Sequence, residues 1–103
     1  MYIYRITPTR PDMLSEGPTD EEATIAGLHF AYLNDLATDG IVLLAGRTQT
    51  TTPDSFGIII FNAASDDEAW EIVENDPGVK HGVFHAELFP YKIAVLSEDI
   101  GLH

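Results

Sequence analysis

The chain has 103 residues, enough for one hydrophobic core, so a single domain over residues 1–103 is the default expectation. Seventeen acidic residues against five basic ones give a formal charge of −12, which disfavours nucleic acid and anionic membranes as partners. The absence of cysteine excludes disulfides and thiolate chemistry, and no apolar stretch approaches the ~18 residues of a membrane span. Without a recognisable secretion signal, these features predict a cytoplasmic protein.

The first predicted elements are a strand, a loop and a long helix. Aromatic and β-branched residues over 2–7 are typical of a strand. Prolines and a glycine over 8–18 disfavour both strand and helix, so this segment is predicted to be a loop. Thr19 with Glu22 three residues later forms a capping-box pattern, which predicts a helix that begins there and ends at Gly40.

Shorter elements follow in the second half of the chain. Residues 41–45 and 56–61 are apolar runs on either side of a threonine-rich segment, which predicts a hairpin of two strands. Ser65, with a glutamate three residues later, predicts a second helix that stops at Asp76-Pro77-Gly78. Residues 82–96 supply the last predicted strand.

The predicted order, β-α-β-β-α-β, indicates an α+β fold of ferredoxin-like type, with two helices on one face of a four-stranded antiparallel sheet. Strict alternation places side chains of the second strand on two faces, both of them apolar: Ile41, Leu43 and Ala45 against Val42 and Leu44. An open face of this kind needs a cover, and a second copy of the sheet fits it. We therefore expect a homodimer.

Two polar residues lie where they could carry acid–base chemistry. His29 falls within the apolar stripe of the first predicted helix, and an imidazole exchanges protons near neutral pH. Asp76, at the end of the second helix, could orient the ring and stabilise its charged form. The residues alone leave a plainer alternative open, in which His29 is a hydrogen-bonded core histidine and Asp76 only ends a helix before proline.

Arg47 is the candidate for substrate binding, because it follows a buried strand and a guanidinium pairs with a carboxylate through two hydrogen bonds. The alternative is an exposed arginine that pairs with one of the many acids. Tyr32 and Trp70 could line a pocket, although aromatic residues at helical spacing usually belong to the core. His81 and His85 fall in a turn and a strand, so no metal site is predicted. No glycine-rich nucleotide motif is present, and no cofactor is predicted.

Four segments of the chain, in this order, resemble the YciI-like (YCII-related) family of the dimeric αβ-barrel superfamily. They are His29-Phe-Ala-Tyr-Leu33-Asn-Asp-Leu36, Gly40-Ile-Val-Leu-Leu-Ala45-Gly46, Glu68-Ala69-Trp70, and Asp76-Pro77 with Gly82-Val83-Phe84 and Pro90-Tyr91. The resemblance implies a dimeric αβ-barrel in which His29 and Asp76 form the catalytic pair. Two positions depart from the family pattern near this site: Arg47 replaces a proline after Ala-Gly, and Gly78 replaces a bulky aromatic residue after Asp-Pro.

These observations lead to two main functional hypotheses. The first is a small-molecule enzyme without a cofactor, in which His29 exchanges a proton with a substrate, Asp76 orients the ring, and Arg47 and Tyr32 bind the substrate. The superfamily's range of reactions implies an isomerase or a lyase. The second is a non-catalytic dimer that binds a metabolite or docks a basic partner. A cofactor-free monooxygenase ranks last, because Trp70 alone does not assemble the site that such chemistry needs.

Overall fold

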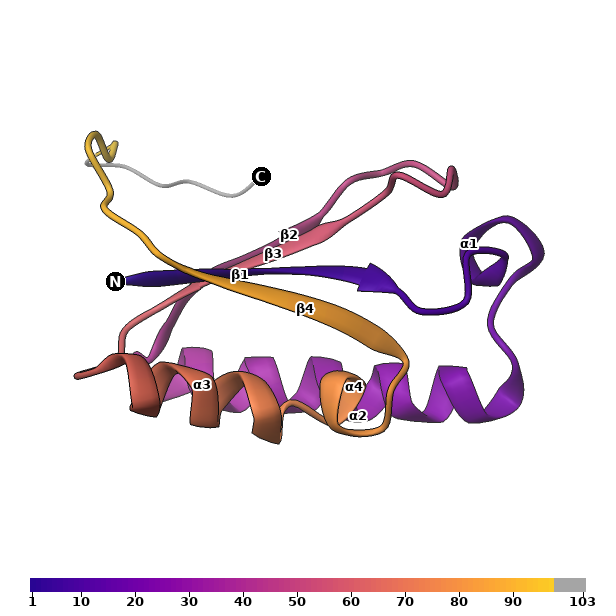
Figure 1. The fold of residues 1–103 in the computed structure, drawn as a ribbon, viewed down its shortest axis with the longest axis horizontal. Helices are drawn as coiled ribbons and strands as arrows, with labels where there is room; N and C mark the ends of the chain where they lie inside the picture. Colours follow the sequence, from indigo (N-terminus) through magenta and orange to yellow (C-terminus); the bar gives the residue numbers. More distant parts are fainter. Residues whose placement is uncertain (98–103) are drawn as a thin grey trace.

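The structure is a computed structural model that describes residues 1–97, which form four strands and four helices. In chain order they are β1 (Tyr2–Pro8), α1 (Met13–Glu16), α2 (Asp20–Thr38), β2 (Val42–Arg47), β3 (Gly57–Phe61), α3 (Asp66–Asn75), α4 (Pro77–Lys80) and β4 (Phe84–Pro90). The sheet order is β2-β3-β1-β4, and all neighbouring strands are antiparallel. Figure 1 shows α2, α3 and α4 together on one side of this sheet. The predicted ferredoxin-like α+β fold is confirmed.

Local signals set the ends of the long helix α2. The Thr19 side chain accepts a hydrogen bond from the Glu22 backbone N–H, and the Glu22 side chain accepts one from the Thr19 N–H, which completes the predicted capping box. At the other end, Gly40 adopts a φ of +78°, and its N–H donates to the Ala37 carbonyl. A left-handed residue of this kind ends a helix, as the sequence predicts.

The segment over residues 8–18 is not entirely a loop, and here the prediction was wrong. Residues 13–16 form the single helical turn α1, and the Met13 side chain is buried in a small cluster with Ile25 and Val83. Pro11 precedes the turn and Pro18 follows it, so neither ring removes a hydrogen bond that the turn needs. The burial of Met13 depends on tertiary contacts, which the positions of prolines in the sequence do not reveal.

The core lies between the helices and the inner face of the sheet. Tyr4 and Phe61 are completely buried and pack edge to face, with ring centroids 5.7 Å apart. They meet Ala69 and Val73 of α3 and Leu33 of α2, which are also buried. None of the helices in residues 1–97 is long and apolar enough to cross a bilayer.

A β-bulge interrupts the pairing of β2 with β3. The register places Val42 opposite Phe61, shifts by one residue between Val42 and Leu44, and then places Ala45 opposite Ile59. Phe61 and Ile59 both point into the core, so Val42 and Ala45 share the inner face. Strict alternation had placed these two residues on opposite faces, and the extra residue of the bulge is the reason for the correction.

Within residues 1–97, no helix covers the other face of the sheet (Figure 1). The side chains that lie next to one another across the strands of this face are largely apolar. They are Ile3, Leu44, Ile58, Ile60 and Phe89. Leu44 and Phe89 are 39% and 48% exposed. The charged side chains Arg5 and Glu87 pair with each other at 3.8 Å on the same face. An uncovered apolar sheet face is typical of an interaction surface.

Candidate active site

The helix α2 directs His29 toward the sheet. Ile25 and Leu33, which lie one turn to either side of it, are buried, and only 12% of the His29 side chain is exposed. Asp76 ends α3 and also caps α4, where its Oδ1 accepts the N–H of Gly78 at 2.9 Å. Proline at the next position suits the first turn of a helix, because its missing N–H would have no partner there. The Asp-Pro-Gly sequence therefore joins two helices and fixes the carboxylate between them.

His29 and Asp76 are in direct contact. The His29 Nδ1 lies 2.7 Å from Oδ1 and 2.8 Å from Oδ2 of Asp76, whose side chain is completely buried. An ionised carboxylate only accepts hydrogen bonds, so the network assigns the proton to Nδ1. Nδ1 is thereby occupied, and Nε2 is the ring nitrogen that remains for a ligand.

Tyr4 is a member of this network that the sequence analysis did not identify. Its hydroxyl donates to Asp76 Oδ2 at 2.8 Å, from a ring that is completely buried. Burial, together with the negative charge of Asp76, raises the pKa of the Tyr4 hydroxyl far above its usual value, so it remains a donor. A buried tyrosine on the inner face of a strand usually has a hydrogen-bond partner for its hydroxyl, but the sequence does not identify that partner.

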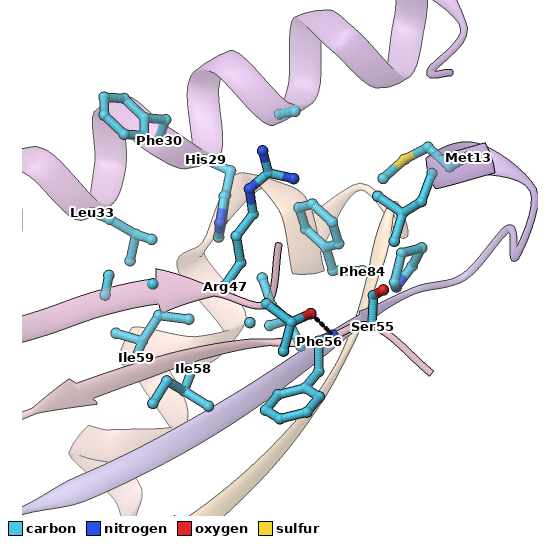
Figure 2. A pocket seen from close by; sticks show the side chains of 18 of the residues that line it. Met13, His29, Phe30, Leu33, Arg47, Ser55, Phe56, Ile58, Ile59 and Phe84 are labelled. Carbon is cyan, nitrogen blue, oxygen red and sulfur yellow. Dashed lines mark hydrogen bonds between the residues drawn. The ribbon is translucent and has the colours of Figure 1, made fainter. Parts of the chain in front are cut away.

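A cavity of about 600 Å³ lies beside His29, between α2 and the inner side of β2 and β3. It exists because small residues line both walls: Ala26 and Ala37 on α2, and Ala45, Gly46 and Gly57 on the hairpin. Phe84 packs against His29, with ring centroids 5.0 Å apart (Figure 2). A volume of this size suits a small organic molecule.

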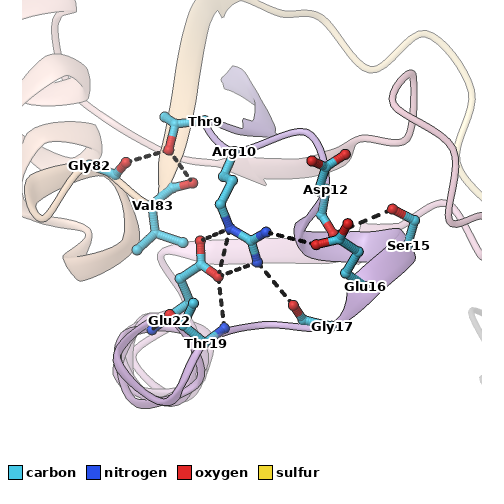
Figure 3. A network of polar contacts seen from close by, with 10 residues as sticks. All are labelled: Thr9, Arg10, Asp12, Ser15, Glu16, Gly17, Thr19, Glu22, Gly82 and Val83. Carbon is cyan, nitrogen blue, oxygen red and sulfur yellow. Dashed lines mark hydrogen bonds and ion pairs between the residues drawn. The ribbon is translucent and has the colours of Figure 1, made fainter.

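The α1 segment closes one end of the cavity, where Met13 and Leu14 contribute to its lining. Arg10 ties this segment to α2, as Figure 3 shows: its Nη2 donates to Glu22 Oε1 at 2.8 Å and to the Gly17 carbonyl at 2.9 Å. These hydrogen bonds from Arg10 are the main cause that lowers the pKa of the Glu22 carboxyl to about 2. The same carboxylate thus caps α2 and holds the cavity wall.

Arg47 and Tyr32, the two predicted substrate-binding residues, lie in different places. Arg47 lines the cavity, and Figure 2 shows its side chain extending from β2 toward the helix that carries His29. Tyr32 is not among the lining residues; its hydroxyl donates to the Ile72 carbonyl at 2.7 Å, between α2 and α3. Burial is the main cause that raises the pKa of Tyr32 to about 12. Trp70 is 45% exposed on α3 and also lies away from the cavity.

Gly78 explains how α4 can lie against His29 and Phe84. A Cβ atom at this position would overlap Cδ2 of Phe84, and would lie 2.9 Å from Cε2 of that ring and 3.3 Å from His29 Nδ1. A larger residue after Asp-Pro therefore requires Phe84 to move. Within residues 1–97, no group of three or more histidine or acidic side chains is placed to hold a metal ion.

Comparisons with known proteins identify the family and a similar solved structure. Residues 1–92 match the family described as the YCII-related domain. The solved structure of 5-chloro-2-hydroxyhydroquinone dehydrochlorinase (TftG) from Burkholderia phenoliruptrix AC1100, in complex with 2,5-dihydroxybenzoquinone, is similar, with a TM-score of 0.63 and 26% sequence identity. That match covers 89% of this chain and 94% of the dehydrochlorinase chain. Among curated proteins, none matches the chain significantly.

Proposed function

The chain belongs to the YCII-related family, and on this premise we propose that it is a small-molecule enzyme that uses His29 and Asp76 for acid–base chemistry. The observation that carries the proposal is the buried Asp76 carboxylate on Nδ1 of His29, which leaves Nε2 for a molecule in the cavity. The similar dehydrochlorinase, by its name, removes hydrogen chloride from a small molecule. Its likeness supports an enzyme of the lyase or isomerase type.

In the proposed reaction, Nε2 of His29 takes a proton from a carbon or oxygen atom of the substrate. The electron pair of the broken bond stays on the substrate, and Asp76 stabilises the imidazolium that forms. In an elimination, this electron pair forms a double bond and a leaving group departs with its own pair. In an isomerisation, His29 returns the proton to another atom. Neither route requires a redox step.

Tyr4 and the Gly78 N–H would position the carboxylate in this reaction, since both donate to Asp76. A non-catalytic binding protein would use the same cavity. It would not account for a completely buried carboxylate with three donors, one of which is the ring that faces the cavity. This network favours the enzyme over the binding protein.

Proton transfer is testable by solvent exchange. We expect wild-type protein in D₂O to release chloride or to exchange carbon-bound hydrogen in a panel of hydroxylated aromatics and small organic acids that includes 5-chloro-2-hydroxyhydroquinone. His29→Gln should lower this rate by about 10²–10⁴-fold, because a glutamine amide takes no proton near neutral pH. NMR and ion chromatography provide the readout.

His81→Gln is the matched control for this experiment, because His81 is exposed at the end of α4 and does not line the cavity. It should leave the rate unchanged. Thermal unfolding should show both variants to be folded. A rate that is equal in wild type and His29→Gln would contradict the assignment of His29, and exchange with no member of the panel would favour a binding protein.

We also propose that two copies of the chain pair through the uncovered sheet face. The support is the apolar character of Ile3, Ile58 and Ile60 at its centre, and the fact that Arg5 and Glu87 offset each other in a strongly acidic chain. A face that is almost neutral avoids the mutual repulsion expected of two chains with a charge of −12.

The dimer is tested by measuring mass in solution. Sedimentation equilibrium at micromolar concentration should give twice the chain mass of 11.3 kDa for the wild type. Ile60→Glu should shift the mass toward the monomer, because it buries a carboxylate in the middle of the proposed contact. Leu28→Glu, which changes a residue that is 51% exposed on α2, should remain dimeric. A monomeric wild type, or a dimeric Ile60→Glu variant, would refute the proposed interface.

A further inference from the structure

The charges around the cavity are opposite in sign to those of the chain as a whole. The chain carries 17 acidic and 5 basic residues, yet among residues 1–97 no acidic side chain lines the cavity. Arg47 lines it, together with His29 and otherwise apolar or hydroxyl-bearing residues. Asp76 lies behind His29 and is completely buried, so it does not line the cavity either. From the part of the chain that the structure describes, a ligand in the cavity therefore meets one fixed positive charge and no negative one.

Arg47 is also unpaired within the described part of the chain. Residues 1–97 contain ion pairs of Arg5, Arg10 and His29 with acids, but none of Arg47. The register places Arg47 opposite Gly57, which has no side chain to fill the space beside it. In an acidic protein, an arginine that points into a cavity rather than toward a surface acid retains all of its donors for a ligand.

Two walls of the cavity complete the site. Phe84, Leu33 and Val42 present apolar surface on the side of His29 and the core. Thr48 also lines the cavity, and its hydroxyl, whose oxygen accepts the backbone N–H of Phe56 at 3.1 Å, has a single neutral O–H to donate against the charged donors of Arg47. The guanidinium is thus the strongest donor available to a ligand.

We propose that the cavity binds organic carboxylates, with the two carboxylate oxygens on the Arg47 guanidinium and an apolar body against Leu33, Val42 and Phe84. A planar guanidinium matches two carboxylate oxygens, and a single cation balances a single negative charge. A phosphate monoester, with up to two negative charges, would be left undercompensated. This inference rests on the function proposed above, because it names the class of molecule that would be presented to His29.

Binding of matched probes tests the proposal. Isothermal titration calorimetry with 2-naphthoate, 2-naphthamide and 2-naphthyl phosphate compares an anion, a neutral isostere and a phosphate on the same apolar body. Wild-type protein should bind the naphthoate more tightly than either of the others. Arg47→Met, which keeps an unbranched apolar side chain, should raise the Kd for naphthoate by about 10–100-fold. The Kd of Arg47→Lys for naphthoate should lie between those of the wild type and Arg47→Met, because lysine keeps the charge but loses the second hydrogen bond.

Lys80→Met is the matched control, because it removes the same charge from an exposed position on α4 that does not line the cavity. Its Kd should stay within twofold of wild type. Equal affinity for naphthoate and naphthamide, a wild-type Kd in Arg47→Met, tighter binding of the phosphate, or no binding of naphthoate would each overturn the proposal.

Two combinations of results separate this inference from the proposed reaction. If Arg47→Met weakens naphthoate binding while no substrate exchanges its protons, the carboxylate site stands and the acid–base function fails. If exchange depends on His29 while Arg47→Met binds naphthoate like the wild type, the function stands and the carboxylate site fails.

Discussion

Replacing Asp76 with alanine is expected to lower the free energy of unfolding by about 3–5 kcal/mol. The carboxylate is completely buried and accepts hydrogen bonds from the Tyr4 hydroxyl, the Gly78 N–H and the His29 ring. Alanine removes all of these acceptors at once and leaves the three donors in a space with little access to water. It also removes the cap of α4.

Urea unfolding followed by circular dichroism measures this loss. Asp76→Asn should be less damaging, because its amide oxygen still accepts one or two of the hydrogen bonds, and it provides a folded variant should alanine prevent folding. Asp35→Ala, at an exposed position in the last turn of α2, should change stability by no more than about 0.5 kcal/mol. A loss below about 1 kcal/mol in Asp76→Ala would mean that the network does not hold the helices together.

Two glycine-to-alanine substitutions are expected to change the stability of the protein in opposite directions. Gly78→Ala should destabilise the protein by about 1–3 kcal/mol, because the new methyl group overlaps the Phe84 ring and crowds His29. Gly27→Ala should stabilise it by about 0.5–1 kcal/mol, because this residue lies within α2 with no atom near its missing Cβ.

The same pair of variants probes the site as well as the fold. Any displacement of Phe84 changes one wall of the cavity, so Gly78→Ala should also weaken ligand binding, while Gly27→Ala should leave it unchanged. Thermal unfolding of the two variants measures the change in stability, and calorimetry measures the change in ligand binding. A Gly78→Ala protein as stable as wild type would show that Phe84 moves aside without cost.

The sequence predicted the features that depend on neighbouring residues. The ends of α2 follow from Thr19, Glu22 and Gly40. Each of these residues acts on backbone groups within about one helical turn of its own position. The residue types alone left the pairing of His29 with Asp76 as one of two alternatives, and the family resemblance favoured it, since 47 residues separate the two and spacing alone does not bring them together.

Other features arise from tertiary contacts and could not be predicted in this way. Tyr4 lies 72 residues from Asp76, and its period-two position explains why it is buried but not which group it meets. Tyr32 has the helical spacing of a pocket residue, yet its hydroxyl is used between α2 and α3. Met13 forms part of a helical turn because it is buried against Ile25 and Val83, contacts that a loop prediction does not include.

The bulge in β2 has a consequence for how ligand choice could change in this family. The one-residue shift after Val42 is what turns Arg47 toward the inner face, opposite Gly57. If the same residues paired regularly, without the bulge, Gly46 would lie opposite Gly57 and the Arg47 guanidinium would point to the open face of the sheet, with no change at position 47 itself. A relative that keeps all of these residues but pairs them without the bulge would thus present a different side chain to its ligand, even with an arginine at the same position.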